Sequence, residues 1–247
     1  MSAGTRIEWA DASWQTISGC SPISPGCTNC YASKMTRRLQ AMGQKKYAAG
    51  FDKVVCHEEA LKEPFGWKKP RRIFVNSMAD TFHKDVPDAF IDQIWGTTIL
   101  CQQHVFMFLT KRAERMYEFI TDHPAFVGKP RYELGWVQPN VWLGVTVESQ
   151  AQLDRIEWLK KTPAAVRFVS FEPLLSEIPP LDFTGLHWIV CGAETGPGAR
   201  PMSLRWADDL RSLCAAAKVA FFFKKPSKGD IIPPCLNVHE FPEVSHV

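Results

Sequence analysis

"VWLGVTVESQAQLDRIEWLKKTPAAVRFVSFE", residues 141–172, combines two kinds of pattern. The run 141–147 is almost continuously apolar and rich in valine, which is typical of a strand buried on both faces of a parallel sheet. The segment 149–161 then carries apolar residues at helical spacing behind Ser149, a good N-terminal cap. A second apolar run follows at 166–171. The stretch therefore predicts a strand, a helix and a second, parallel strand.

The same alternation extends over most of the chain. The other apolar runs, most of them rich in Val, Ile, Phe and Trp, lie at residues 14–19, 72–77, 105–110, 187–192 and 219–224. Segments with helical spacing lie at residues 31–43, 87–103, 111–123 and 203–218, the last of them behind a capping Ser203. Seven strands with mostly helical connections indicate an α/β fold.

The expected architecture is a partial or full (β/α) barrel of the TIM type with parallel strands. We expect one domain over residues 1–247, in which 44–70 is an irregular insertion and 225–247 an irregular C-terminal tail. An open doubly wound sheet is the alternative, but that fold usually has a glycine-rich phosphate turn after its first strand. Here the first run ends in "GCSPISPGC" instead.

The composition is that of an ordinary globular protein, with 45% hydrophobic and 22% charged residues and a net charge of +3, too small to require a polyanionic partner. The N-terminus has no long apolar core and no apolar run approaches 18 residues, so we expect neither a signal peptide nor a transmembrane helix. We therefore expect a cytoplasmic protein, whose thiols stay reduced, and the eight cysteines then need a role other than disulfides. Cys101, Cys191 and Cys214 lie in apolar surroundings typical of a core.

Polar groups follow every predicted strand, and in a parallel barrel these ends meet at one rim. Three strands are followed within two residues by a carboxylate, namely Glu148, Glu172 and Glu194. A rim of carboxylates, hydroxyls and cations suits a polar cofactor and substrate, and a purely structural ion network is the alternative. The other polar residues at these ends are Asn76, Ser77, Asp80, Thr110, Lys111, Arg112, Thr146, Ser170, Lys224 and Lys225.

Cys20, Cys27 and Cys30 follow the first strand within eleven residues. Thiolates bind zinc or the irons of a cluster. Structural zinc normally has four ligands, and only Cys56 and His57 offer a distant fourth. A thioredoxin-like redox pair leaves Cys20 without a role. Three thiols without an obvious fourth favour a [4Fe–4S] cluster with one open iron that binds a small molecule.

The stretch "GCSPISPGCTNCYA" resembles the cluster loop of radical S-adenosylmethionine enzymes. Together with "FVNSMADTFH", "WLGVTVESQAQLDRI" and "WIVCGAETGPGARPM", it resembles a phage Gp-type family, found often in phages and bacteria and described only as three-cysteine-motif proteins of unknown function. The usual radical-enzyme motif is C-x3-C-x2-C, whereas six residues separate Cys20 from Cys27 here. Asn29 replaces the usual aromatic residue, and "VNSMAD" stands where a Gly-Gly-Glu ends the second strand.

The radical-enzyme resemblance implies a [4Fe–4S] cluster on Cys20, Cys27 and Cys30, S-adenosylmethionine bound to it, and an electron donor. Roles for the rim residues then follow from strand position alone. The methionine moiety is assigned to Asn76, Ser77 and Asp80, the ribose to Thr146 and Glu148, the adenosine side to Ser170 and Glu172 with Glu194 at the same mouth, and an anionic substrate to Lys111, Arg112, Arg200 and Lys224.

Two functions remain open. The first is reductive cleavage of S-adenosylmethionine to modify or repair a substrate, and the phage association and basic rim favour a nucleic acid or nucleotide, by analogy with spore photoproduct lyase-like enzymes. The second is a nucleic-acid-binding protein stabilised by zinc or a cluster and without catalysis. Its nine tryptophans and clustered basic residues permit base stacking and phosphate contact.

Overall fold

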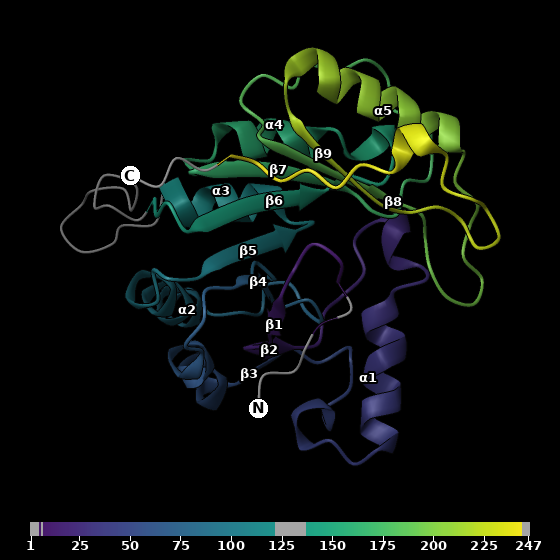
Figure 1. The fold of residues 1–247 in the computed structure, drawn as a ribbon. Coiled ribbons are helices and arrows are strands. Elements are labelled where there is room, and N and C mark those ends of the chain that lie inside the picture. The colour runs from purple at the N-terminus through teal and green to yellow at the C-terminus, as the bar shows by residue number, and fades with distance from the viewer. Residues whose placement is uncertain (1–4, 6, 122–136, 244–247) are drawn as a thin grey trace.

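The structure, a computed structural model, describes residues 5, 7–121 and 137–243. Its centre is a sheet of seven strands in which all neighbours are parallel (Figure 1). This confirms the α/β class. In sheet order the strands are β1 (Ala12–Trp14), β4 (Arg72–Val75), β5 (Val105–Thr110), β6 (Val141–Thr146), β7 (Val166–Phe171), β8 (Trp188–Gly192) and β9 (Ala220–Lys225).

The order of the strands in the sheet is their order in the chain. A doubly wound sheet reverses its order at a switch point, so that alternative is excluded. Crossovers that all run in one direction place their helices on one face, and the sheet curls so that the other face is concave. Because β1 and β9 are the two edges of the sheet, the structure is a partial barrel and not a closed one.

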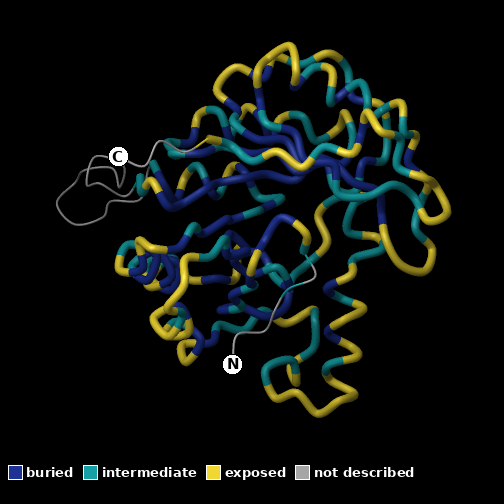
Figure 2. The backbone as a smooth tube through the Cα atoms, in the orientation of Figure 1, coloured by how far each residue is buried: buried dark blue, intermediate teal, exposed yellow. Residues whose placement is uncertain are grey.

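The convex face of the sheet packs against four helices. They bury aromatic side chains such as Trp95 and Phe119 against outward-facing strand residues such as Phe108 and Ile189. The helices are α2 (Asp88–Leu100), α3 (Ala113–Thr121), α4 (Asp154–Lys161) and α5 (Leu204–Ala217). Figure 2 shows the strands as the most deeply buried part of the chain.

The concave face is filled by aromatic rings at the amino ends of the strands. Trp188 lies between Trp142 and Phe168, with ring centroids 5.9 Å and 5.5 Å away, and Trp9 packs against it from the N-terminal segment. Gly144 has no side chain because the Phe168 ring occupies that space, within 2.5 Å of an added Cβ. Since the rings block the amino end of this face, polar groups meet at the carboxyl end.

The first predicted strand, residues 14–19, is wrong as a single element. The sheet strand β1 ends at Trp14, and β2 (Ile17–Ser18) instead pairs antiparallel with β3 (Val55–Cys56). The cause is Asn76, whose Oδ1 accepts hydrogen bonds from the backbone of Thr16 (2.8 Å) and Ile17 (3.0 Å) and so turns the chain out of the sheet.

The other predicted elements form close to their expected bounds. The segment 31–43 forms α1 (Tyr31–Ala41), and 149–161 divides into the 3₁₀ helix η5 (Gln150–Gln152) and α4. Ser149 and Ser203 stand at N-cap positions, but neither side chain caps a backbone N–H. The end of the predicted helix 111–123 and the last four residues of the tail lie outside the described residues.

The irregular segments contain only short elements. Residues 44–70 hold β3 and the 3₁₀ helices η2 (Lys45–Tyr47) and η3 (Glu58–Gly66), and the tail holds η6 (Pro234–Leu236). Cys101, Cys191 and Cys214 are buried in the core as expected. Within the described ranges, no helix has the length and apolarity needed to cross a membrane.

Candidate metal and cofactor site

The loop with three cysteines is built on unusual backbone geometry. Gly19 has a positive φ of 86°, and a Cβ there would lie 2.1 Å from the carbonyl oxygen of Lys53, so only glycine fits before Cys20. Cys27 ends the 3₁₀ helix η1 (Pro25–Cys27), and Cys30 is the N-cap residue of α1. All three thiols are free and half-buried.

One flank of this loop is fixed by Glu148, which follows β6. Its side chain is fully buried, and its carboxylate accepts a hydrogen bond of 2.6 Å from Ser24 in the cysteine loop. The carboxylate also pairs with Arg155 of α4 at 2.9 Å and with Lys111 at 3.7 Å. Gly26 leaves room for this carboxylate, because an added Cβ would lie 2.4 Å from its Oε1.

The other flank is fixed by Glu194, which follows β8. Glu194 accepts hydrogen bonds from Asn29 of the loop (2.9 Å) and from the backbone and guanidinium of Arg200, and Arg200 also donates to the carbonyl oxygen of Pro25 (3.0 Å). The hydrogen bonds from Arg200 lower the pKa of Glu194 to about 2. The carboxylate is therefore charged at any physiological pH.

Cys20 itself is contacted from β5 and its neighbours. Arg112 pairs with Asp80 at 2.8 Å, donates to the Ser21 carbonyl oxygen at 3.0 Å, and lies 3.7 Å from Cys20 Sγ. Thr110 donates to the second oxygen of Asp80 at 2.7 Å. Burial, helped by the nearby Asp80 carboxylate, raises the pKa of the Cys20 thiol to about 11, so binding a metal must displace a proton from it.

His83 adds a further contact to this group. The backbone N–H of Asp85 donates to His83 Nδ1 (3.2 Å), so the ring proton is on Nε2, which donates to Ser21 Oγ at 2.7 Å. Because the oxygen of Ser21 accepts this bond and one from Arg112 (3.2 Å), its own proton remains for a third partner.

Glu172 and Lys224 form a separate pair on the concave face. The lysine Nζ lies 2.9 Å from the carboxylate, and Ser170 donates to the other carboxylate oxygen at 3.1 Å. Gly192 leaves this carboxylate its space, because a Cβ there would lie 2.9 Å from Glu172 Oε1. Unlike Glu148 and Glu194, Glu172 has no hydrogen bond to the cysteine loop among the described contacts.

Three further predicted residues are engaged in hydrogen bonds within the chain. The amide of Asn76 is buried and is bonded to the turn after β1 and, at 2.9 Å, to Thr81. Ser77 Oγ accepts a 2.6 Å bond from Gln15, while its carbonyl oxygen accepts the hydroxyl of Tyr31. Thr146 is buried, and its carbonyl oxygen accepts a 2.7 Å bond from Arg155.

The donor set of the loop consists of three thiols. Within the described residues, no three His, Cys, Asp or Glu side chains stand close enough together to hold one metal ion, and this includes Cys56 and His57 with the three thiols. Three soft ligands without a carboxylate or imidazole among them fit iron–sulfur chemistry.

Several contacts of the site were missed by sequence reasoning. Ser24 and Asn29 lie inside the cysteine loop, and in the sequence only their polar character within "SPGCTN" could have indicated a role. Arg155 stands on an otherwise ordinary amphipathic helix, and nothing in the sequence marks it as the partner of Glu148. His83 lies at the end of "VNSMADTFH", where it carries no pattern of its own.

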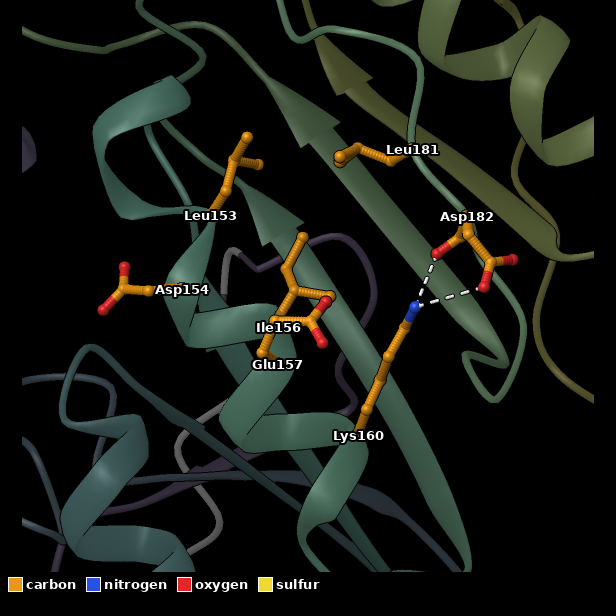
Figure 3. Close-up of a pocket in the computed structure, with 7 residues that line it drawn as sticks. All are labelled: Leu153, Asp154, Ile156, Glu157, Lys160, Leu181 and Asp182. Atoms are coloured by element: carbon orange, nitrogen blue, oxygen red, sulfur yellow. Dashed lines mark hydrogen bonds and ion pairs between the residues drawn. The ribbon is translucent and has the colours of Figure 1, made fainter.

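A small pocket elsewhere does not share these residues. It has a volume of about 220 Å³ and lies between α4 and the segment at Leu181 and Asp182 (Figure 3). Lys160 crosses it to donate to the Asp182 carbonyl oxygen at 2.7 Å. None of the predicted site residues lines it.

Comparison with known proteins places the chain in a family. Residues 4–231 match the model described as "Protein of unknown function (DUF5131)", and the chain belongs to this family. None of the curated proteins matches it.

Two solved structures of spore photoproduct lyase are similar to the fold. A double mutant with bound AdoMet and dinucleoside spore photoproduct has a TM-score of 0.48 at 9% identity, over 86% of this chain and 63% of the lyase. A complex with dinucleoside spore photoproduct has a TM-score of 0.45 at 9% identity, over 78% and 58%. This chain thus spans less than two thirds of the lyase.

Proposed function

We propose that this member of the DUF5131 family is an iron–sulfur enzyme that cleaves S-adenosylmethionine reductively in order to modify a nucleotide or nucleic acid. One observation carries the proposal: the loop with three free cysteines is attached on both flanks to the carboxyl ends of parallel strands. Ser24 binds Glu148 after β6, and Asn29 binds Glu194 after β8. Carboxyl ends are where barrel enzymes carry their chemistry.

Cys20, Cys27 and Cys30 are the proposed ligands of a [4Fe–4S] cluster. Three thiolates leave one iron open, and such a cluster, once reduced by an external donor, supplies one electron to the sulfonium of S-adenosylmethionine. Arg112 has two roles here, since its guanidinium both orients Ser21 and lies beside Cys20 Sγ. A cation near a thiolate stabilises the deprotonated form that a metal needs.

The rim residues divide into positioning and contact groups. Glu148, Glu194 and Asp80 each pair with a cation and hold the loop or its neighbours, so we assign them to positioning. Glu172 and Ser170, which are hydrogen-bonded to each other at the carboxyl end of β7, are the proposed contacts to S-adenosylmethionine.

The four cations expected to bind an anionic substrate are already engaged. Lys111, Arg112, Arg200 and Lys224 each pair with a carboxylate of the rim. Their charges balance the carboxylates within the site. An anionic substrate therefore needs further cations outside this ring.

The test is anaerobic reconstitution followed by measurement of iron, sulfide and 5′-deoxyadenosine. The expected result is a brown protein with about four irons per chain that forms 5′-deoxyadenosine slowly when reduced. Replacing Cys20, Cys27 or Cys30 singly with Ala should remove the cluster, while Cys101→Ala, in the core, should keep it. A colourless zinc protein, or a loaded and reducible cluster that does not cleave S-adenosylmethionine, contradicts the proposal.

A further inference from the structure

The segment around the cysteine loop contains no acidic residue. Between residues 12 and 51 there is no Asp or Glu, although 26 acidic residues in 247 would place about four in a stretch of forty. The same segment has five basic residues, all in α1 or near it: Lys34, Arg37, Arg38, Lys45 and Lys46. Positive charge is therefore concentrated on the part of the chain that carries the proposed ligands.

Helix α1 extends away from the sheet and is mostly exposed (Figures 1 and 2). Only Ala32 and Thr36 are buried in it. Arg37, Arg38 and Lys45 are exposed, and among the described residues no carboxylate pairs with any of them. Charges without an internal partner remain available to a polyanion.

The exposed side of α1 also carries apolar groups. Tyr31, Met35 and Met42 are 49%, 39% and 62% exposed and share one face of the helix at intervals of four and seven residues. Arg38 lies in the same row, so the apolar side chains alternate with charge. An interfacial membrane helix instead presents a face of Trp, Phe and Leu side chains, whereas Leu39 is the only such residue in α1 and is half-buried.

The helix begins at the proposed cluster. Cys30 is its N-cap and Tyr31 its first residue, so a ligand lying along α1 has one end at the site. Eleven residues span about 16 Å, the length of about five phosphates in one strand of nucleic acid.

We propose that α1, with the adjoining Lys45, is a docking surface for the phosphodiester backbone of a nucleic-acid strand. Arg37, Arg38 and Lys45 contact phosphates, and bases contact the Met35 thioether and the half-exposed Tyr31 ring, whose hydroxyl stays bonded to Ser77. The inference rests on the proposed function, because it names a nucleic-acid strand as the substrate of the same site. Binding itself needs no turnover.

The test is binding of labelled DNA and RNA oligonucleotides of about 12 nucleotides to the full chain, measured by fluorescence anisotropy at several salt concentrations. The variant replaces Arg37, Arg38 and Lys45 with Gln. Each phosphate contact in a single strand contributes about 0.7 to the salt slope, so the slope should fall by about 2 and affinity at about 0.1 M salt by about 100-fold. Whichever oligonucleotide binds more tightly identifies the sugar, and either supports the proposal.

A matched control removes the same charge elsewhere. The triple variant K68Q, K69Q and R205Q changes exposed cations on other elements and should bind like the wild-type protein. A second variant, R37K with R38K, keeps the charge of α1 and should retain most of the affinity. Circular dichroism of each variant shows that the helices are intact.

Several results overturn the inference. An equal loss of affinity in both triple variants means that oligonucleotide binding depends on net charge and not on α1. If the α1 variant binds oligonucleotides as tightly as the wild-type protein, α1 is not the docking surface. Tighter binding to phosphatidylserine vesicles or to polyglutamate than to oligonucleotides assigns it to a membrane or an acidic protein. Oligonucleotide binding that depends on α1, in a protein that does not cleave S-adenosylmethionine, contradicts the proposed function and leaves this inference standing.

Discussion

Replacing Glu148 with Gln should destabilise the protein strongly, because Glu148 is the partner of a buried cation. The carboxylate is fully buried, and the side chain of Arg155 is only 9% exposed. The glutamine keeps the shape and can still accept the hydrogen bond from Ser24. Among the described residues, the charge of Arg155 is then left with the carbonyl oxygen of Thr146 as its partner.

The size of the effect follows from burial. Removing one partner of a buried ion pair costs about 3–5 kcal/mol, because the remaining charge is neither paired nor hydrated. In a chain of this size 1 kcal/mol corresponds to about 2–4 °C, so Tm should fall by about 6–20 °C. Lys111 lies farther away at 3.7 Å and is more exposed, so it adds little to this loss.

The assay is thermal and urea unfolding of E148Q, R155M and the double variant. In the double variant the buried cation is gone as well, so the loss should be smaller than the sum of the two single losses. The control is Glu172→Gln, which should be milder because its partner Lys224 is 21% exposed and can turn to solvent. If E148Q unfolds like the wild-type protein but loses S-adenosylmethionine binding, Glu148 contacts the ligand and the assignment to positioning is refuted.

Three further predictions concern the loop, acid stability and the core. G26A should lose about 1–3 kcal/mol and load less iron than the wild-type protein, because the new methyl group overlaps Glu148; equal stability and iron content would contradict the contact. Glu194 has a lowered pKa of about 2. Its contribution to the free energy of unfolding is therefore fully present above about pH 4.5 and is lost as the pH falls from there towards 2. The shift corresponds to at most about 3.5 kcal/mol. Screening at Arg200, which is 35% exposed, reduces this to about 1–2 kcal/mol. Urea unfolding across this range should show the loss in the wild-type protein and a flatter profile in E194Q. C101A should cost about 1–3 kcal/mol in stability without loss of iron, and loss of iron would show that this thiol does more than pack.

The amino-acid sequence by itself determined where most strands and helices lie, because the pattern of apolar residues reflects which faces of each element are buried. Runs such as 141–147 and 166–171 are apolar throughout because both faces of a parallel strand are covered, and that periodicity is visible without any tertiary information. The three cysteines were equally visible, because three thiols in eleven residues are unusual in a protein that needs no disulfides.

Partnerships across the sheet were decided only by the tertiary structure. Glu148 and Arg155 are seven residues apart, and Asn29 and Glu194 are 165 apart; no local pattern distinguishes these pairs from others. The curl of the sheet sets which strand ends meet the loop, and Asn76 sets where β1 stops. The exposure of α1 likewise depends on where the chain leaves the sheet, since its sequence alone is as amphipathic as that of a helix packed on the core.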